Sequence, residues 1–115
     1  MKKISIESFD KTMMKDFIVL SGRDLGDNIR KKFKLDELDK DNEIYEVSFP
    51  KNIISISTSF FLAVFGKSVR NCGSKENFEK KYVFNVNSSL KSNINDGITD
   101  ALNNVDGLSL WKKQL

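Results

Sequence analysis

The centre of the fold is predicted to be the stretch Ile53-Ile54-Ser55-Ile56-Ser57-Thr58-Ser59-Phe60-Phe61-Leu62-Ala63-Val64-Phe65-Gly66, with the rest of the chain packed around it. Its first residues nearly alternate between apolar and small polar side chains, which is typical of a strand. Three hydroxyl residues follow, and then an unbroken apolar run and a glycine. Hydroxyl oxygens accept hydrogen bonds from the first free N–H groups of a helix. We therefore expect a sheet strand leading into a buried helix, with Ser57, Thr58 and Ser59 at the helix N-terminus.

This helix is predicted to run from Thr58 to about Asn71, and Cys72-Gly73 closes it because glycine adopts the left-handed turn at low cost. One structural alternative is that Phe60 to Phe65 forms a strand hairpinned onto the preceding residues. The absence of Gly and Asn from the turn disfavours that hairpin. We interpret the apolar run as core rather than as the lining of a ligand pocket.

Length and composition predict one soluble domain. The chain has 115 residues, of which 39% are hydrophobic, and nine are Phe. This suffices for a single core, so we expect one domain over 1–115, with a core of about 17–103 and a tail of 104–115. The N-terminus lacks the apolar segment of a signal peptide, and no apolar run is long enough to span a membrane. A cytoplasmic location is the default expectation.

Missing residue types exclude several kinds of chemistry. The sequence has no histidine, which removes Ser-His-Asp and Cys-His catalysis and most zinc sites. The single cysteine, Cys72, excludes an internal disulfide, and we interpret it as an inert thiol. No carboxylate pair stands out, because the acidic residues from Asp36 to Glu43 resemble a solvated charge run. We expect no enzymatic activity and no cofactor.

The net charge of +3 comes from 19 basic and 16 acidic residues. Nucleic-acid-binding domains usually show a denser basic stripe. Binding to nucleic acid is therefore not the favoured reading.

Strands and helices alternate along the chain. Strands are expected at Lys3–Glu7, Phe17–Leu20, Ile44–Phe49 and Tyr82–Val86. In the helix over Asp24–Phe33, the apolar residues Leu25, Ile29 and Phe33 share one face. Asp36–Glu43 either extends this helix or forms a loop, and Lys75–Lys81 is expected to be a charged connection.

A last helix begins after a cap at Asn87 or Ser88 and carries an apolar residue at every fourth position. The predicted order is β-β-α-β-α-β-α, which favours an α/β fold with a small mixed sheet and helices packed on it. The apolar tail with Trp111 can dock on this chain or on a second copy, so a homodimer is one arrangement that it allows.

Two local motifs contain residue types that are found in anion-binding sites. Gly66-Lys67-Ser68 matches the end of a phosphate-binding P-loop, but Phe61 stands where the loop needs its first glycine, so we reject that reading. Ser57, Thr58 and Ser59 are interpreted first as helix caps. They also form a candidate anion or phosphorylation site, because free N–H groups and the helix dipole stabilise negative charge there.

Thr58-Ser59-Phe60-Phe61-Leu62-Ala63-Val64-Phe65-Gly66-Lys67-Ser68-Val69-Arg70 resembles the Ser-Ser-Phe-Leu-x-x-x-Phe-Gly-x-x-Val-Arg stretch of the STAS-like domain family. Upstream, Ser21-Gly22-Arg23 and Ile29-Arg30 resemble the start of that family's first helix. The resemblance covers roughly Phe17 to Asn103. It implies a STAS-like α/β fold in a bacterial or phage protein.

The same stretch is more distantly similar to the STAS domains of anti-sigma-factor antagonists. In those proteins a kinase phosphorylates a serine at a helix start, and the phosphate breaks a protein–protein complex. Ser59 matches that serine and Thr58 the residue before it. Ser57 and Phe60 depart from the pattern, which has aspartate and glycine there.

The resemblance implies a non-enzymatic regulatory module that binds a protein partner, such as a histidine-kinase-type ATPase. Ser57, Thr58 and Ser59 form the expected regulated edge, with Phe60, Phe61 and Arg23 as partner-binding candidates. Two alternatives stay open. One is a small-ligand or nucleotide binder at the same helix N-terminus, and the other is a phage or plasmid effector that blocks a host complex.

Overall fold

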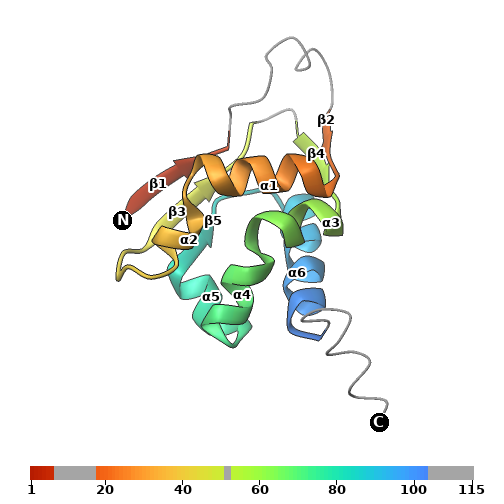
Figure 1. Ribbon diagram of the computed structural model, residues 1–115. Coiled ribbons are helices and arrows are strands. Elements are labelled where there is room, and N and C mark those ends of the chain that lie inside the picture. The colour runs from red at the N-terminus through yellow and green to blue at the C-terminus, as the bar shows by residue number, and fades with distance from the viewer. Residues whose placement is uncertain (7–17, 51–52, 104–115) are drawn as a thin grey trace.

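The computed structural model describes residues 1–6, 18–50 and 53–103, which form an α/β fold. Helices cover one side of a small sheet, with a second pair of strands beside it (Figure 1). The elements in chain order are β1 (Lys2–Ser5), β2 (Ile18–Leu20), α1 (Arg23–Lys32), α2 (Leu35–Leu38), β3 (Tyr45–Ser48), β4 (Ile53–Ile56), α3 (Thr58–Phe61), the π-helical turn η2 (Leu62–Gly66), α4 (Lys67–Cys72), α5 (Lys75–Lys81), β5 (Tyr82–Phe84) and α6 (Ser88–Asn103).

The main sheet has three parallel strands in the order β1-β3-β5. The strand at Tyr45–Ser48 is central, as its apolar and aromatic residues predict. Side chains alternate strictly between its two faces. One face is buried beneath the helices by rows such as Ile4–Val47–Phe84, whereas the other carries Lys3, Glu46 and Val83.

A separate two-stranded sheet joins β2 to β4, again in parallel. The sequence predicts a single mixed sheet, whereas every strand pair among the described residues is parallel and the pairs divide between two sheets. The front half of the organising stretch, Ile53–Ile56, is thus a strand in its own right. It leads directly into the helical run at Thr58, as expected, and not into a hairpin.

The helical run from Thr58 to Cys72 contains a π turn at Leu62–Gly66. Apart from Gly66, its buried residues fall in three pairs spaced by four: Phe60 and Phe61, Val64 and Phe65, and Ser68 and Val69. Four residues of an α-helix rotate about 40° past a full turn, so this spacing drifts off a straight face. A π turn has a wider hydrogen-bond spacing and absorbs the drift. All three pairs therefore face the core.

Two glycines let other helices approach this run closely. A Cβ added to Gly26 of α1 would lie 2.5 Å from the Cβ of Ala63 and 2.7 Å from the carbonyl oxygen of Phe60. A Cβ added to Gly97 of α6 would lie 2.3 Å from the ring of Phe61. The start of the run is therefore held between α1 and α6, and Gly97 has a packing reason that outweighs its poor helix propensity.

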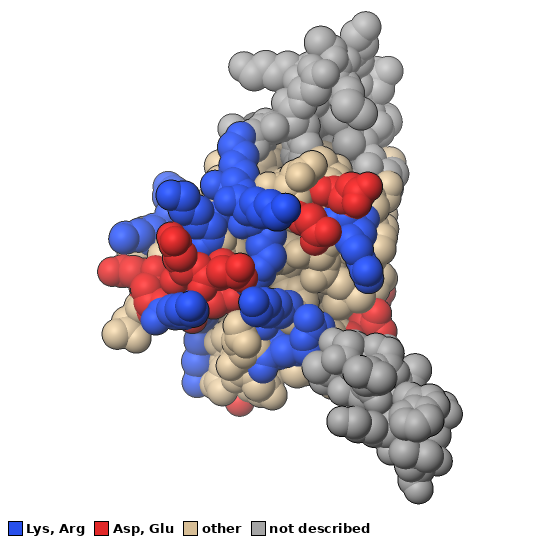
Figure 2. Space-filling model, viewed as in Figure 1, with Lys and Arg blue, Asp and Glu red and all other residues tan. Residues whose placement is uncertain are grey.

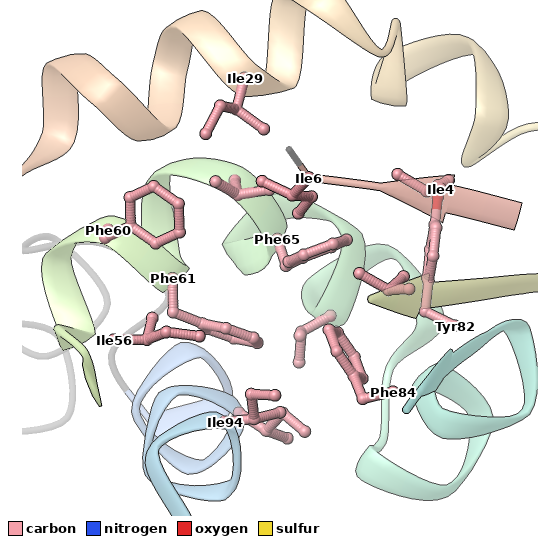
Figure 3. Close-up of a cluster of buried hydrophobic side chains, with 14 of the residues drawn as sticks. Ile4, Ile6, Ile29, Ile56, Phe60, Phe61, Phe65, Tyr82, Phe84 and Ile94 are labelled. Atoms are coloured by element: carbon pink, nitrogen blue, oxygen red, sulfur yellow. The ribbon is translucent and has the colours of Figure 1, made fainter. Parts of the chain in front are cut away.

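The aromatic core lies between η2, α5 and the buried face of the main sheet (Figure 3). The ring of Phe65 contacts Tyr82 and Phe84 of β5 with centroids 5.4 and 5.2 Å apart, and Phe61 lies beside it at 5.6 Å. Phe78 of α5 closes the cluster. The apolar run Phe60–Phe65 is thus the centre of the core, as the sequence predicts.

The prediction for Lys75–Lys81 was wrong, because this segment is the helix α5. The Ser74 hydroxyl caps it by accepting a hydrogen bond from the Asn77 N–H at 3.1 Å, and Phe78 is its one buried anchor. A single apolar residue gives no periodic pattern, which is why the sequence suggested a connection. The tail at 104–115 lies outside the described residues.

The remaining helix ends follow the sequence signals. Gly73 closes the long helical run at φ +84°, and Gly22 precedes α1 at φ +95°, where other residues are strained. The Asn87 side chain caps α6 by accepting from the Leu90 N–H at 2.9 Å. Part of the acidic segment, Leu35–Leu38, forms the short helix α2.

Candidate functional site

The hydroxyl cluster lies where the sequence predicts it, at the N-terminus of α3. Ser57 is the cap, because its Oγ accepts a hydrogen bond from the Phe60 N–H at 3.1 Å. Its Oγ also lies 3.1 Å from the Oγ of Ser59. Thr58 and Ser59 are exposed, whereas Ser57 is half-buried. Capping therefore occupies Ser57 and leaves the hydroxyls of Thr58 and Ser59 on the surface.

The two phenylalanines next to this cluster do not reach that surface. Phe60 is 1% exposed and Phe61 2%, and both belong to the core. The expectation that they contact a partner is corrected on this ground, since a partner would have to unpack the core to reach them. Arg23 is exposed at the first position of α1. Figure 1 places the start of α1 at the same end of the molecule as α3.

Acidic side chains lie near the hydroxyl cluster. An open hollow beside Thr58 is lined by Asp96, Thr99, Asp100 and Asn103 of α6. The field of these carboxylates opposes that of the α3 N-terminus. A nucleotide phosphate placed in this hollow would meet both carboxylates, so the geometry disfavours the nucleotide-binding alternative.

A second polar cluster, which sequence reasoning missed, lies at the π turn. Arg30 of α1 donates from Nη1 to the Val64 carbonyl oxygen at 2.6 Å and to the Ser68 Oγ at 3.1 Å. Its Nη2 donates to Asp39 Oδ2 at 2.8 Å. Ser68 is fully buried, and its hydroxyl donates to the same Asp39 oxygen at 2.9 Å. We call Arg30, Asp39, Ser68 and Tyr82 the π-turn network.

Asp39 is the centre of the π-turn network. Its side chain is 3% exposed, and its second oxygen accepts a hydrogen bond from the Tyr82 hydroxyl at 2.6 Å. Burial and this bond raise the pKa of Tyr82 above its usual range. Burial lowers the pKa of Arg30, but hydrogen bonds to Asp39 and Asp36 outweigh it and the pKa is raised. The four residues are therefore connected by hydrogen bonds and an ion pair through Asp39, and they join α1, α4 and β5.

The interpretation of Asp36–Glu43 as a solvated charge run is wrong for two of its residues. Besides Asp39, Asp41 is engaged: its carboxylate accepts from the Tyr45 hydroxyl and from Lys81 Nζ at 3.0 Å. The Tyr45 bond lowers the pKa of Asp41 to about 2, and burial raises that of Tyr45 to about 12. Asp36 stays exposed, and its carboxylate forms ion pairs with both Arg30 and Lys67.

The other sequence candidates offer little chemistry. Lys67 and Ser68 lie inside a helix, as the rejection of a P-loop requires, and Ser68 is buried. Burial raises the pKa of the half-buried Cys72 thiol, which keeps it protonated near neutral pH. Within 1–6, 18–50 and 53–103, no group of three His, Cys, Asp or Glu side chains is arranged to hold a metal ion.

Comparisons with known proteins assign no relative. No protein-family model, curated protein or solved structure matches the chain. In the part of the chain that the structure describes, no helix has the length and apolar character needed to span a membrane.

Proposed function

We propose that the chain is a non-enzymatic regulatory module, STAS-like in character, that binds a protein partner at the N-terminus of α3 and is switched by phosphorylation of Ser59. One observation carries the proposal: Ser57 alone caps the helix, while Ser59, two residues later, is exposed. A kinase can therefore modify Ser59 without removing the cap.

The position of Ser59 suits a phosphate that alters binding without unfolding the helix. A phosphoserine adds about −1.5 to −2 charges and is favourable in the first turn of a helix. Thr58, the residue before Ser59, lines the acidic hollow together with Asp96 and Asp100, so a phosphate on Ser59 adds to the negative charge of this end. Phosphorylation thus turns this end of the molecule strongly negative, which repels an acidic partner surface and leaves the core intact.

The resemblance to STAS-like domains names a histidine-kinase-type ATPase as the first partner to look for. With Phe60 and Phe61 in the core, the binding surface is formed by exposed groups. Thr58, Ser59 and Arg23 supply these groups from α3 and α1. This is a polar surface, suited to a regulated and reversible contact.

The test is a pull-down with the tagged full chain from cells that produce it, read by mass spectrometry. Wild type is compared with Ser59→Asp, and Ser89→Asp is the matched control. Ser89 is exposed in the first turn of α6, where Asn87 is the cap, just as Ser57 is the cap before Ser59. We expect one partner that wild type and Ser89→Asp capture and Ser59→Asp loses, together with a phosphopeptide containing Ser59. Equal capture by all three proteins would refute the switch.

A further inference from the structure

The main sheet has one face that the described residues leave open. Its strands are all parallel, and such sheets almost always have both faces covered. On the open face, Ile44 is 47% exposed and Val83 38%. Met1 lies beside Ile44 by the alternation of β1 and β3 and is 74% exposed. These are three of the four exposed large apolar side chains among the described residues.

The strand register sets out this face in rows. β1 and β3 pair Lys3 with Glu46 and Ser5 with Ser48, one residue pair for each outward row. Continuing the same register by one residue places Met1 beside Ile44. The Met1–Ile44 row is thus apolar, the Lys3–Glu46 row pairs opposite charges, and the Ser5–Ser48 row pairs two hydroxyl groups.

We propose that this open face is the contact surface of a symmetric dimer of this chain. In a two-fold interface, a contact between one residue and a second residue of the partner is always repeated in reverse. A two-fold axis parallel to the strands and midway between β1 and β3 places each β1 above the partner's β3. Every row then meets its own complement: Lys3 lies opposite Glu46, and Ser5 opposite Ser48.

Charge selects this axis over its nearest rival. An axis above β3 itself would place Glu46 opposite its own copy, and two like charges in contact oppose association. The midway axis replaces this contact with two opposite-charge pairs. It also brings Ile44 over the partner's Met1 in the end row of the interface, while Val83 on β5 lies toward the rim.

The dimer surface is separate from the proposed regulatory surface. Figure 1 shows the three-stranded sheet at one side of the molecule and α3 at the other. Three strands of three or four residues form a small face compared with the roughly 800 Å² that each partner buries in a standard interface. The association is therefore expected to be weak and strongly dependent on protein concentration.

Sedimentation equilibrium of the untagged full chain over a range of concentrations tests the dimer. We expect wild type to dimerise with a dissociation constant tighter than about 1 mM. Ile44→Lys should weaken it about tenfold or more, since this apolar contact occurs twice in the interface, and Val83→Lys should weaken it less because Val83 lies toward the rim. Ile54→Lys is the matched control, because Ile54 is 48% exposed but lies on β4 of the other sheet. Ile54→Lys should leave the constant unchanged.

Charge exchange tests the axis even if a lysine at position 44 prevents folding. Lys3→Glu alone and Glu46→Lys alone each place like charges opposite each other and should weaken the dimer about tenfold. The double variant restores opposite charges and should recover the wild-type constant. A wild-type chain that stays monomeric at about 1 mM, or a dimer that Ile54→Lys weakens as much as Ile44→Lys, would overturn the proposal.

Discussion

Ser57 and Ser68 belong to the same helical run, yet they are stabilised in opposite ways. Ser57 accepts one hydrogen bond from the N–H of Phe60, three residues along the chain. Ser68 is buried and bonds to Asp39 and Arg30, which are 29 and 38 residues away. The first is a local cap at a surface, and the second is part of a network assembled only by the tertiary fold.

The two ends of the helical run therefore differ in how readily a side chain can be modified without disturbing the core. At the N-terminal end, exposed hydroxyls can be modified at little cost to the core. At the π turn, Arg30 bonds to the carbonyl of Val64 and fixes the local geometry from outside the helix. Figure 2 shows basic and acidic side chains interspersed on the face that is also seen in Figure 1. The net charge of +3 is a sum over such surface groups, and it therefore gives no information on the buried π-turn network.

The largest expected effect comes from breaking the π-turn network. Asp39→Asn removes the charge beside Arg30 and turns one of the two accepting oxygens into a donor. We expect a loss of about 3 kcal/mol in the free energy of unfolding, since Arg30 loses its buried carboxylate partner and keeps only the exposed Asp36. Urea denaturation followed by circular dichroism measures this loss.

Asp36→Asn is the matched control for Asp39. Asp36 bonds to the same guanidinium at 2.7 Å, but its side chain is 62% exposed. Exposed ion pairs contribute little, so the loss should be a small fraction of that for Asp39→Asn. Comparable losses in the two variants would show that burial does not set the strength of the network.

The same contrast explains what could be predicted from the sequence. The hydroxyl cluster at the helix start, the buried run Phe60–Phe65 and the glycine stop at Gly73 follow from neighbouring residues, and so they were predicted correctly. The π turn and Asp39 were missed because their partners lie in other elements.

The candidate site was predicted only in part for a related reason. Polarity identified Ser57, Thr58 and Ser59, but it could not say which hydroxyl the cap would use. Phe60 and Phe61 were predicted both as core and as partner contacts, because an apolar helix suits either a core or a partner surface. Packing decides between these, and here α1 and α6 close over the phenylalanines through Gly26 and Gly97.

A smaller effect is expected from removing the cap. Ser57→Ala should cost about 1 kcal/mol of stability, because the Phe60 N–H loses its acceptor at the helix start. Ser59→Ala should change stability by less than about 0.5 kcal/mol, since an exposed side chain that does not cap contributes little. Thermal or urea unfolding of the two variants gives this difference directly. If Ser59→Ala were the costlier variant, Ser59 would be the cap, and the division of roles behind the proposed switch would be wrong.

The smallest expected effect is a pH dependence from Asp41, whose side chain is 35% exposed. The hydrogen bond from Tyr45 lowers the pKa of Asp41 from 3.8 to about 2 in the folded chain. A carboxyl group with a lowered folded pKa stabilises the fold above its unfolded pKa and loses that contribution as pH falls toward the folded value. Stability of the wild type should therefore fall between about pH 4 and pH 2 by more than that of Asp41→Asn. Urea midpoints at several pH values would measure both slopes. Parallel slopes would mean that Asp41 is as well stabilised in the unfolded chain as in the fold, and that the acidic segment contributes to stability only through Asp39.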